Sequence, residues 1–145
     1  MSNTTMSQAE REAFFAGLHV GVVAIPAAAV GAAPLSAPVW YDYEPGGNYW
    51  FLTGRTSRKG RLLQVGQKLT LVAQQEALPY AYVSVEGVVV GLRDCTQDDD
   101  TRPMARRYLG VEQGDAYTAA TAAGNDSVRV EVRPERWLSV DYAKQ

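Results

Sequence analysis

Four cations occur within seven residues, where a predicted strand runs into a predicted helix. They are Arg55, Arg58, Lys59 and Arg61. Thr56 or Ser57 would cap that helix, because their hydroxyls can accept hydrogen bonds from the N–H groups of its first turn. Those N–H groups carry positive partial charge, so cations are normally disfavoured there. A bound anion would reverse this balance by contacting N–H groups, a hydroxyl and charged side chains together, and the stretch therefore predicts a phosphate-binding site.

The alternative interpretation is that these cations form a solvated surface that binds nothing. No acidic residue lies between Asn48 and Lys68 to neutralise them, which favours a ligand. The ligand is expected to be small, because a formal net charge of −2 is unlike that of nucleic-acid-binding proteins. The chain contains no GxGxxG motif and no GxxxxGK motif followed by Ser or Thr, so a nucleotide site of the usual α/β kinds is not expected.

Aromatic side chains gather on the predicted strands that flank this site. They are Trp40, Tyr41, Tyr43, Tyr49, Trp50, Tyr80 and Tyr82. Such residues most often pack in the core or at a subunit interface. A flat, conjugated ligand with a phosphate tail would also fit beside these strands, with its tail at the cations.

The elements that position these residues are predicted from hydrophobic periodicity and turn signals. Strands are expected at residues 18–25, 35–43, 49–53, 68–75, 80–93, 127–132 and 137–142, with a bulge at Gly87 or Gly91. Helices are expected at residues 7–17, 58–66, 104–109 and 112–123. Most strands follow one another as hairpins, which favours a single antiparallel barrel with attached helices over residues 1–145, not a doubly wound parallel sheet.

Metal and thiol chemistry are not expected. Cys95 is the only cysteine and His19 the only histidine, which rules out thiolate zinc sites and multi-histidine sites. His19 falls in the apolar run 18–25 and is interpreted as a strand residue. Asp98–Asp100 are interpreted as charges at a helix N-terminus and not as metal ligands. No apolar stretch reaches the roughly 18–20 residues of a membrane span and the N-terminus is unlike a signal peptide, so a cytoplasmic protein without a membrane partner is expected.

Residues 38–74, PVWYDYEPGGNYWFLTGRTSRKGRLLQVGQKLTLVAQ, resemble the pyridoxamine 5'-phosphate oxidase superfamily, the flavin- and deazaflavin-binding split β-barrels. The resemblance rests on the order of strand, glycine and helix and on the Ser-Arg-Lys triplet. It extends more loosely to VSVEG at 83–87 and VEVRPERW at 130–137. It implies a mainly β fold, a six-stranded antiparallel Greek-key split β-barrel with short helices. It also implies a homodimer with two cofactors in the grooves between the subunits.

The resemblance further implies which residues contact the cofactor. The triplet 57–59 matches the phosphate-binding Ser-Arg-Lys of the family, and the pair 52–53 matches the residues before it that touch the cofactor. The strand at 38–40 matches the one whose backbone runs along the flavin ring, and segment 74–82 matches a region turned toward the cofactor. The implied cofactor-binding residues are Pro38, Val39, Trp40, Leu52, Thr53, Ser57, Arg58, Lys59 and Gln74.

Within the superfamily, the chain looks closest to the branch that uses the deazaflavin coenzyme F420. Ala37 and Asp42 stand where pyridoxamine-phosphate oxidases carry basic residues. In the F420 branch hydride passes directly between the cofactor and an unsaturated small-molecule substrate, with few obligatory acid–base side chains. Tyr80, Tyr82 or a bound water are the candidate proton donors. The alternatives are FMN as the cofactor, with oxidase or reductase chemistry, and a non-catalytic FMN or F420 carrier or sensor.

Overall fold

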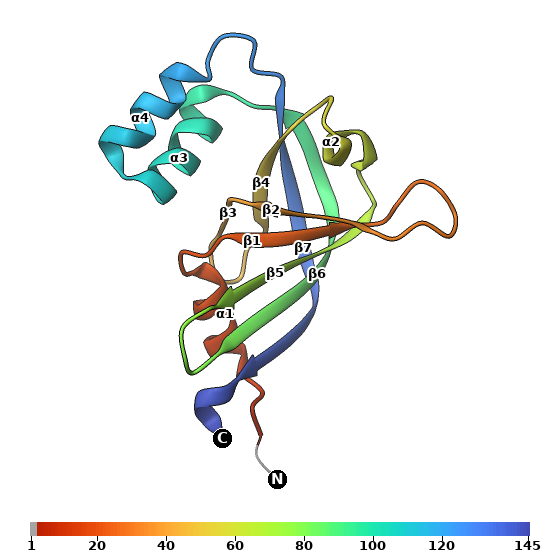
Figure 1. The fold of residues 1–145 in the computed structure, drawn as a ribbon, viewed down its shortest axis with the longest axis vertical. Helices are drawn as coiled ribbons and strands as arrows, with labels where there is room; N and C mark the ends of the chain where they lie inside the picture. The colour runs from red at the N-terminus through yellow and green to blue at the C-terminus, as the bar shows by residue number, and fades with distance from the viewer. Residues whose placement is uncertain (1–2) are drawn as a thin grey trace.

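Within residues 3–145, the part of the chain that the computed structural model describes, one antiparallel sheet of seven strands forms the body of the protein (Figure 1). The strands are β1 (Gly21–Ile25), β2 (Leu35–Val39), β3 (Tyr41–Tyr43), β4 (Tyr49–Gly54), β5 (Lys68–Gln75), β6 (Ala81–Asp94) and β7 (Ser127–Asp141). The helical segments are α1 (Gln8–Ala16), α2 (Arg58–Leu62), η1 (Gln97–Thr101), α3 (Arg102–Leu109), α4 (Val111–Ala120) and η2 (Tyr142–Lys144). The strand order across the sheet is β2-β1-β5-β6-β7-β4-β3.

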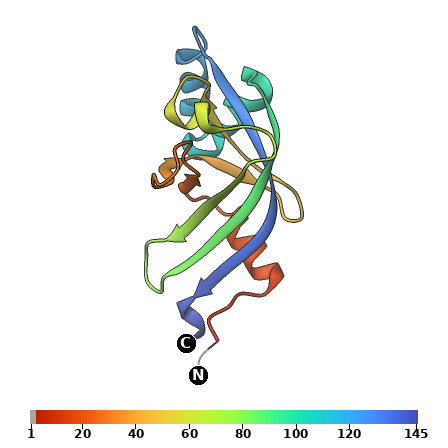
Figure 2. The same ribbon diagram turned by 90° about the vertical axis from the view of Figure 1, so that its right-hand side faces the viewer.

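The hydrophobic core lies on the inner face of the curled sheet, because the strands alternate buried and exposed side chains. In β4, Tyr49, Phe51 and Thr53 are buried while the residues between them are half-buried. Phe15 of α1 is fully buried against aromatic rings of β3, β4 and β7. The long strands β6 and β7 run the length of the molecule and connect the end near α1 with the end near α3 and α4 (Figure 2). None of the helices in the described range is long and apolar enough to cross a membrane.

Trp40 divides the predicted strand 35–43 into two strands. The sheet has seven strands, so the six-stranded form that the resemblance implied is wrong. The first half, β2, pairs with β1, whereas β3 pairs with β4 at the opposite edge of the sheet. Because Trp40 alone links the two halves, the sheet has to curl until its edges approach each other at this residue. Between residues 3 and 145 the two edge strands form no ladder with each other, so the barrel is not closed by hydrogen bonds.

Side chains from α3 stabilise the bend at Trp40. The Tyr41 N–H donates a hydrogen bond to the Tyr108 hydroxyl at 3.0 Å, and Arg107 Nε donates to the Tyr41 carbonyl at 3.0 Å. These contacts satisfy backbone groups of Tyr41, which lies in the edge strand β3. The partners lie more than 60 residues apart in the sequence, and periodicity along residues 35–43 could not reveal them.

The two strands predicted at 127–132 and 137–142 are one continuous strand, β7. Pro134 does not end it, because this residue faces Gly87 of β6 at a shift in register between Glu86 and Gly87. A bulge is one of the few places where a sheet accepts proline. A second shift lies between Val89 and Gly91, so both predicted bulge positions are confirmed.

The N-terminal helix is confirmed, but the prediction that His19 lies in a strand is wrong. Ser7 caps α1 in a reciprocal capping box, in which Glu10 N donates to Ser7 Oγ and Ser7 N donates to Glu10 Oε1. His19 lies between α1 and β1, with its ring stacked on Phe14 at 4.5 Å and its Nε2 2.9 Å from the Phe14 carbonyl. The ring therefore packs on the end of α1, and β1 begins only at Gly21.

Asp98–Asp100 fall in η1, the turn that precedes α3, as the helix-start interpretation predicted. Their roles differ, however. Asp100 is fully buried and accepts hydrogen bonds from Arg93 at 2.7 and 2.8 Å, from Arg129 at 3.1 Å and from the Thr96 N–H at 2.8 Å. This carboxylate attaches η1, and with it α3, to β6 and β7.

Candidate functional site

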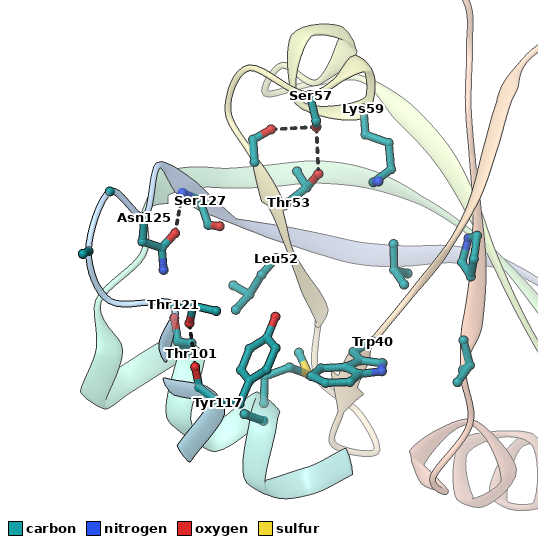
Figure 3. Close-up of a pocket in the computed structure, with 18 residues that line it drawn as sticks. Trp40, Leu52, Thr53, Ser57, Lys59, Thr101, Tyr117, Thr121, Asn125 and Ser127 are labelled. Carbon is teal, nitrogen blue, oxygen red and sulfur yellow. Dashed lines mark hydrogen bonds between the residues drawn. The ribbon is translucent and has the colours of Figure 1, made fainter. Parts of the chain in front are cut away.

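A cavity of about 660 Å³ lies between the ends of β2 and β4 with α2 on one side and α3 with α4 on the other (Figure 3). Seven of the residues predicted to bind a cofactor line it, and they come from three separate elements or their flanks. They are Pro38, Val39, Trp40, Leu52, Thr53, Ser57 and Lys59. The remaining lining residues are Val20, Gly54, Thr101, Met104, Ala105, Tyr117, Thr121, Ala123, Gly124, Asn125 and Ser127.

The other predicted site residues do not line this cavity. Arg58 is exposed at the start of α2, and Gln74 is exposed near the end of β5. Tyr80, which is 51% exposed, and the half-buried Tyr82 lie at the start of β6, away from the cavity. Neither of the two tyrosines considered as proton donors therefore lines the cavity that contains Ser57 and Lys59.

The four cations of the opening stretch separate into different environments. Arg55 forms an ion pair with Asp94, and Arg61 Nε donates to the Thr56 carbonyl at 2.8 Å. Arg58 and Lys59 take part in no ion pair within residues 3–145, but only Lys59 reaches the cavity. Among residues 3–145, Lys59 is the one charged residue that lines the cavity, and no carboxylate lines it. The cavity therefore carries a positive charge.

Ser57 is confirmed as the N-cap of α2. Its hydroxyl accepts a hydrogen bond from Gly60 N at 3.0 Å and donates one to the Gly54 carbonyl at 2.7 Å. A serine hydroxyl has one proton to donate, so these contacts use it within the loop. The turn is also tight, since a Cβ at Gly60 would lie 2.1 Å from the Gly54 oxygen. Ser57 thus stabilises the loop that carries Lys59, and its hydroxyl proton is not available to a ligand.

The polar end of the cavity contains residues that the sequence analysis missed. Asn125 Oδ1 accepts a hydrogen bond from Ser127 N at 2.8 Å, and the Asn125 amide protons have no partner among residues 3–145, so they can bind a ligand. Ser127 pairs with Gly54 in the β4–β7 ladder, so the loop before β7 lies next to the start of the α2 loop. This pairing joins segments more than 70 residues apart, and no local motif indicates it.

The opposite end of the cavity is aromatic and apolar. The Trp40 ring stacks on Tyr108, with ring centroids 5.0 Å apart and an interplanar angle of 7°. Burial, the largest contribution, raises the pKa of the Tyr108 hydroxyl, which donates to the His19 carbonyl at 2.5 Å. Met104, Ala105 and Leu52 continue the apolar surface. Figure 3 shows Ser57 and Lys59 at one end of the cavity and Trp40 at the other.

Several solved structures share this fold, although no family model and no curated protein sequence matches the chain. A conserved hypothetical protein from Mycobacterium tuberculosis superposes with a TM-score of 0.73 at 20% identity, covering 99% of this chain and 90% of its own. A protein named F420 reductase gives 0.69 at 20% identity, covering 88% and 94%. A Listeria innocua protein provisionally assigned as a pyridoxamine 5'-phosphate oxidase gives 0.61 at 10% identity, covering 91% and 96%.

These similarities show the fold. The resemblance stated for residues 38–74 is therefore confirmed at the level of architecture: the chain is a mainly β, antiparallel structure with the split-barrel arrangement of pyridoxamine 5'-phosphate oxidase-like proteins. It departs from the expected form in having seven strands and an unclosed sheet.

Proposed function

We propose that this protein is a flavin- or deazaflavin-dependent oxidoreductase, and that F420 in its reduced form is the cofactor that transfers hydride to an unsaturated small molecule. The observation that carries the proposal is the convergence of seven predicted residues on one cavity that has a cation at one end and a tryptophan at the other. The structural similarity to a protein named F420 reductase supports the choice of cofactor.

The residues present fit such a group. The cavity volume of about 660 Å³ lies within the range of roughly 300–1,000 Å³ that ligand pockets occupy. Lys59 and the first N–H groups of α2 would hold an anionic tail, and the Asn125 amide lies across the cavity from Lys59 (Figure 3). Val39, Leu52 and Trp40 would contact a flat ring. When bound, a reduced flavin or deazaflavin supplies the hydride, so the protein has to bind, orient and exclude water.

A paired ligand test examines the phosphate end. We expect Lys59→Gln to weaken FMN binding about tenfold or more, because hydrogen bonds to charged groups contribute about 1.5–3 kcal/mol. Riboflavin, which lacks the phosphate, should bind wild type and Lys59→Gln equally. F420 should lose affinity as FMN does, because its tail is also anionic. Dissociation constants are measured by quenching of flavin or deazaflavin fluorescence.

Arg58→Gln is the matched control, because it removes a neighbouring cation that does not line the cavity. It should reduce FMN affinity less than Lys59→Gln does. Equal losses of FMN and riboflavin in Lys59→Gln would contradict the assignment of the phosphate end. Oxidoreductase activity is then tested by adding unsaturated acceptors to bound, reduced F420; reoxidation no faster than that of free cofactor would favour the carrier function.

We also propose that the protein is a homodimer whose subunits meet on the outer face of the sheet. One row of outward side chains crosses five strands in register, from Pro38 through Val22, Val72 and Ser84 to Leu138. Val22 is 43% exposed and Leu138 58% exposed, so the row presents apolar surface. Pro38 also lines the cavity, and a second subunit on this row would therefore lie beside the cavity opening.

Light scattering after size-exclusion chromatography tests the dimer. Wild type should elute as a dimer and Leu138→Lys as a folded monomer, because a charge buried in an apolar interface has to be desolvated. Val30→Lys is the control, since Val30 is exposed in the β1–β2 connection and not in the row. A monomeric wild type at micromolar concentration would contradict the proposal.

A further inference from the structure

Helix α4 presents a tyrosine hydroxyl to the cavity. Tyr117 lines the cavity from the side opposite β4, and Figure 3 shows its hydroxyl pointing inward, toward Leu52. The side chain is 42% exposed, and its hydroxyl forms no hydrogen bond with any residue of the range 3–145. It is therefore available to a ligand, and the sequence analysis, which considered Tyr80 and Tyr82, did not identify it.

The position of Tyr117 is determined by the close packing of α4 on α3. A Cβ at Gly114 would lie 2.7 Å from Arg106 N and Cα, so only glycine permits this approach of the two helices. Arg106 also forms a two-bond ion pair with Asp115, at 2.7 and 2.9 Å. Gln97 Nε2 donates to the Thr118 carbonyl at 3.3 Å and attaches α4 to η1. These contacts lie within one helical turn of Tyr117 and hold its ring at the cavity wall.

The surface around the Tyr117 hydroxyl is mostly apolar. Its ring lies 5.5 Å from the Trp40 ring at an angle of 51°. Leu52, Met104 and Ala105 line the same end of the cavity, away from Lys59. Thr101 and Thr121 also line this side, but the Thr101 hydroxyl is buried and Thr121 Oγ1 donates to the Tyr117 carbonyl at 2.9 Å. A ligand at this end would thus contact mainly aromatic and aliphatic groups, with the Tyr117 hydroxyl as the exposed donor for its polar atom. A phenolic O–H conjugated with its ring is a better donor than acceptor, so that atom should be an acceptor.

We propose that Tyr117 binds the carbonyl oxygen of a flat, apolar cyclic ketone that packs against Met104 and Ala105. Calling this ketone the substrate rests on the proposed function, whereas the binding site itself does not. The ketone occupies the helical side of the cavity, across from the strands that would hold the cofactor ring. The Tyr117 hydroxyl then fixes which edge of the ketone faces α4.

Two ligands that differ only in the carbonyl test this inference: 1-indanone and indane. Their dissociation constants are measured by quenching of tryptophan fluorescence in wild type, Tyr117→Phe and Tyr142→Phe. Wild type should prefer 1-indanone, and Tyr117→Phe should reduce that preference about fivefold, because one neutral hydrogen bond contributes about 1 kcal/mol. Tyr142→Phe, with a tyrosine of similar exposure in η2, should keep the full preference. Thermal melting of each variant checks that it is folded.

The inference is overturned if Tyr117→Phe retains the wild-type preference or weakens both ligands equally. The FMN and F420 affinities of the same variants separate this outcome from failure of the proposed function. A wild type that binds cofactor but shows no ketone preference contradicts the inference alone. A wild type that binds neither cofactor, yet prefers 1-indanone through Tyr117, contradicts the proposed function alone.

Discussion

Two buried threonines, one in η1 and one in α4, differ in how their hydroxyls are paired. Thr101 is 6% exposed, and its Oγ1 has no hydrogen-bond partner in the described chain. Thr118 is 1% exposed, and its Oγ1 donates to the Gly114 carbonyl at 2.8 Å. A buried polar atom without a partner costs about 1–3 kcal/mol, whereas a formed hydrogen bond contributes about 1 kcal/mol. The same substitution should therefore act in opposite directions at the two positions.

Thr101→Val should raise the free energy of unfolding by up to about 1 kcal/mol, and Thr118→Val should lower it by about 1 kcal/mol. Valine keeps the shape of threonine, so the pair compares the hydroxyls with little change in packing. Urea denaturation at neutral pH measures both values. Equal destabilisation of the two variants would mean that the Thr101 hydroxyl has a partner in solution, and a bound water in the cavity would be the first candidate.

At the residue scale, the sequence predicted features that depend on neighbouring residues, but not contacts between distant ones. The Ser57 cap and the cations after it were predictable, because N-cap residue types and charge runs are local signals. Which cation faces the cavity was not predictable, because Arg58 and Lys59 are adjacent and only the path of α2 distinguishes them. Tyr117 was missed for a similar reason: only the contact of Gly114 with Arg106 brings α4 to the cavity.

At the element scale, Asp100 is the attachment point of the helical wall. Burial, the largest single contribution, raises the pKa of this carboxyl, but the hydrogen bonds from Arg93, the Thr96 N–H and Arg129 outweigh it and lower the pKa overall. Because the native pKa lies below the unfolded value of about 3.9, this stabilisation is fully present above that value. It is lost as the pH falls through the native pKa.

Asp100→Asn should therefore reduce stability at neutral pH by about 2 kcal/mol and flatten the loss of stability at acid pH. The magnitude is below the usual cost of breaking a buried pair, because the Arg93 side chain is 51% exposed and remains hydrated. Asp99→Asn is the control, since it removes an exposed neighbouring charge. Urea unfolding between pH 2 and 7 measures both. If the free energy of unfolding of Asp100→Asn falls as steeply at acid pH as that of wild type, other carboxylates cause the loss of stability.

The two bulges of β6 make different demands on their glycines. A Cβ at Gly87 would lie 2.5 Å from Val132 Cγ1 and 2.7 Å from the Arg133 carbonyl, whereas a Cβ at Gly91 would meet only Glu131 Cβ at 3.4 Å. Gly87→Ala should thus cost about 1–3 kcal/mol through overpacking. Gly91→Ala should change stability by less than about 1 kcal/mol, because restricting the unfolded chain offsets the small contact. Thermal unfolding compares them, and similar losses in both variants would show that the bulges are equally crowded.

At the scale of the whole molecule, the prediction of an antiparallel, mainly β fold was right, but two strand boundaries were wrong, at Trp40 and at Pro134. Alternating hydrophobicity in 68–75 and 80–93 identified β5 and β6, and hairpin order indicated an antiparallel sheet. Trp40 and Pro134 were misassigned because each sits at a bend or bulge whose stability depends on a distant partner. The resemblance of residues 38–74 supplied the split-barrel expectation that periodicity alone could not.

The C-terminal segment is tied to the residues that precede α1 (Figures 1 and 2). Asp141 N donates to the Thr4 carbonyl at 2.8 Å, and Lys144 Nζ lies 2.8 Å from Glu10 Oε1. The hydrogen bond from Lys144, followed by that from the Ser7 backbone, lowers the pKa of Glu10 from 4.5 to about 2. The stabilisation linked to this carboxylate is present above about pH 4.5 and is lost as the pH falls toward 2.

Lys144→Ala should raise the pKa of Glu10 toward its ordinary value, and it should speed hydrogen exchange at the backbone amide of Asp141, whose acceptor is near the N-terminus. Carboxyl-carbon NMR titration and amide exchange measure the two effects. Lys68→Ala serves as the control, because its ammonium lies 3.6 Å from Glu135 on the sheet and does not contact the termini. An unchanged pKa of Glu10 in Lys144→Ala would mean that the capping box with Ser7 alone holds the carboxylate. In that case the C-terminal residues would be held to the segment before α1 by the Asp141–Thr4 hydrogen bond and by Ser139, whose Oγ accepts from Met6 N at 3.1 Å.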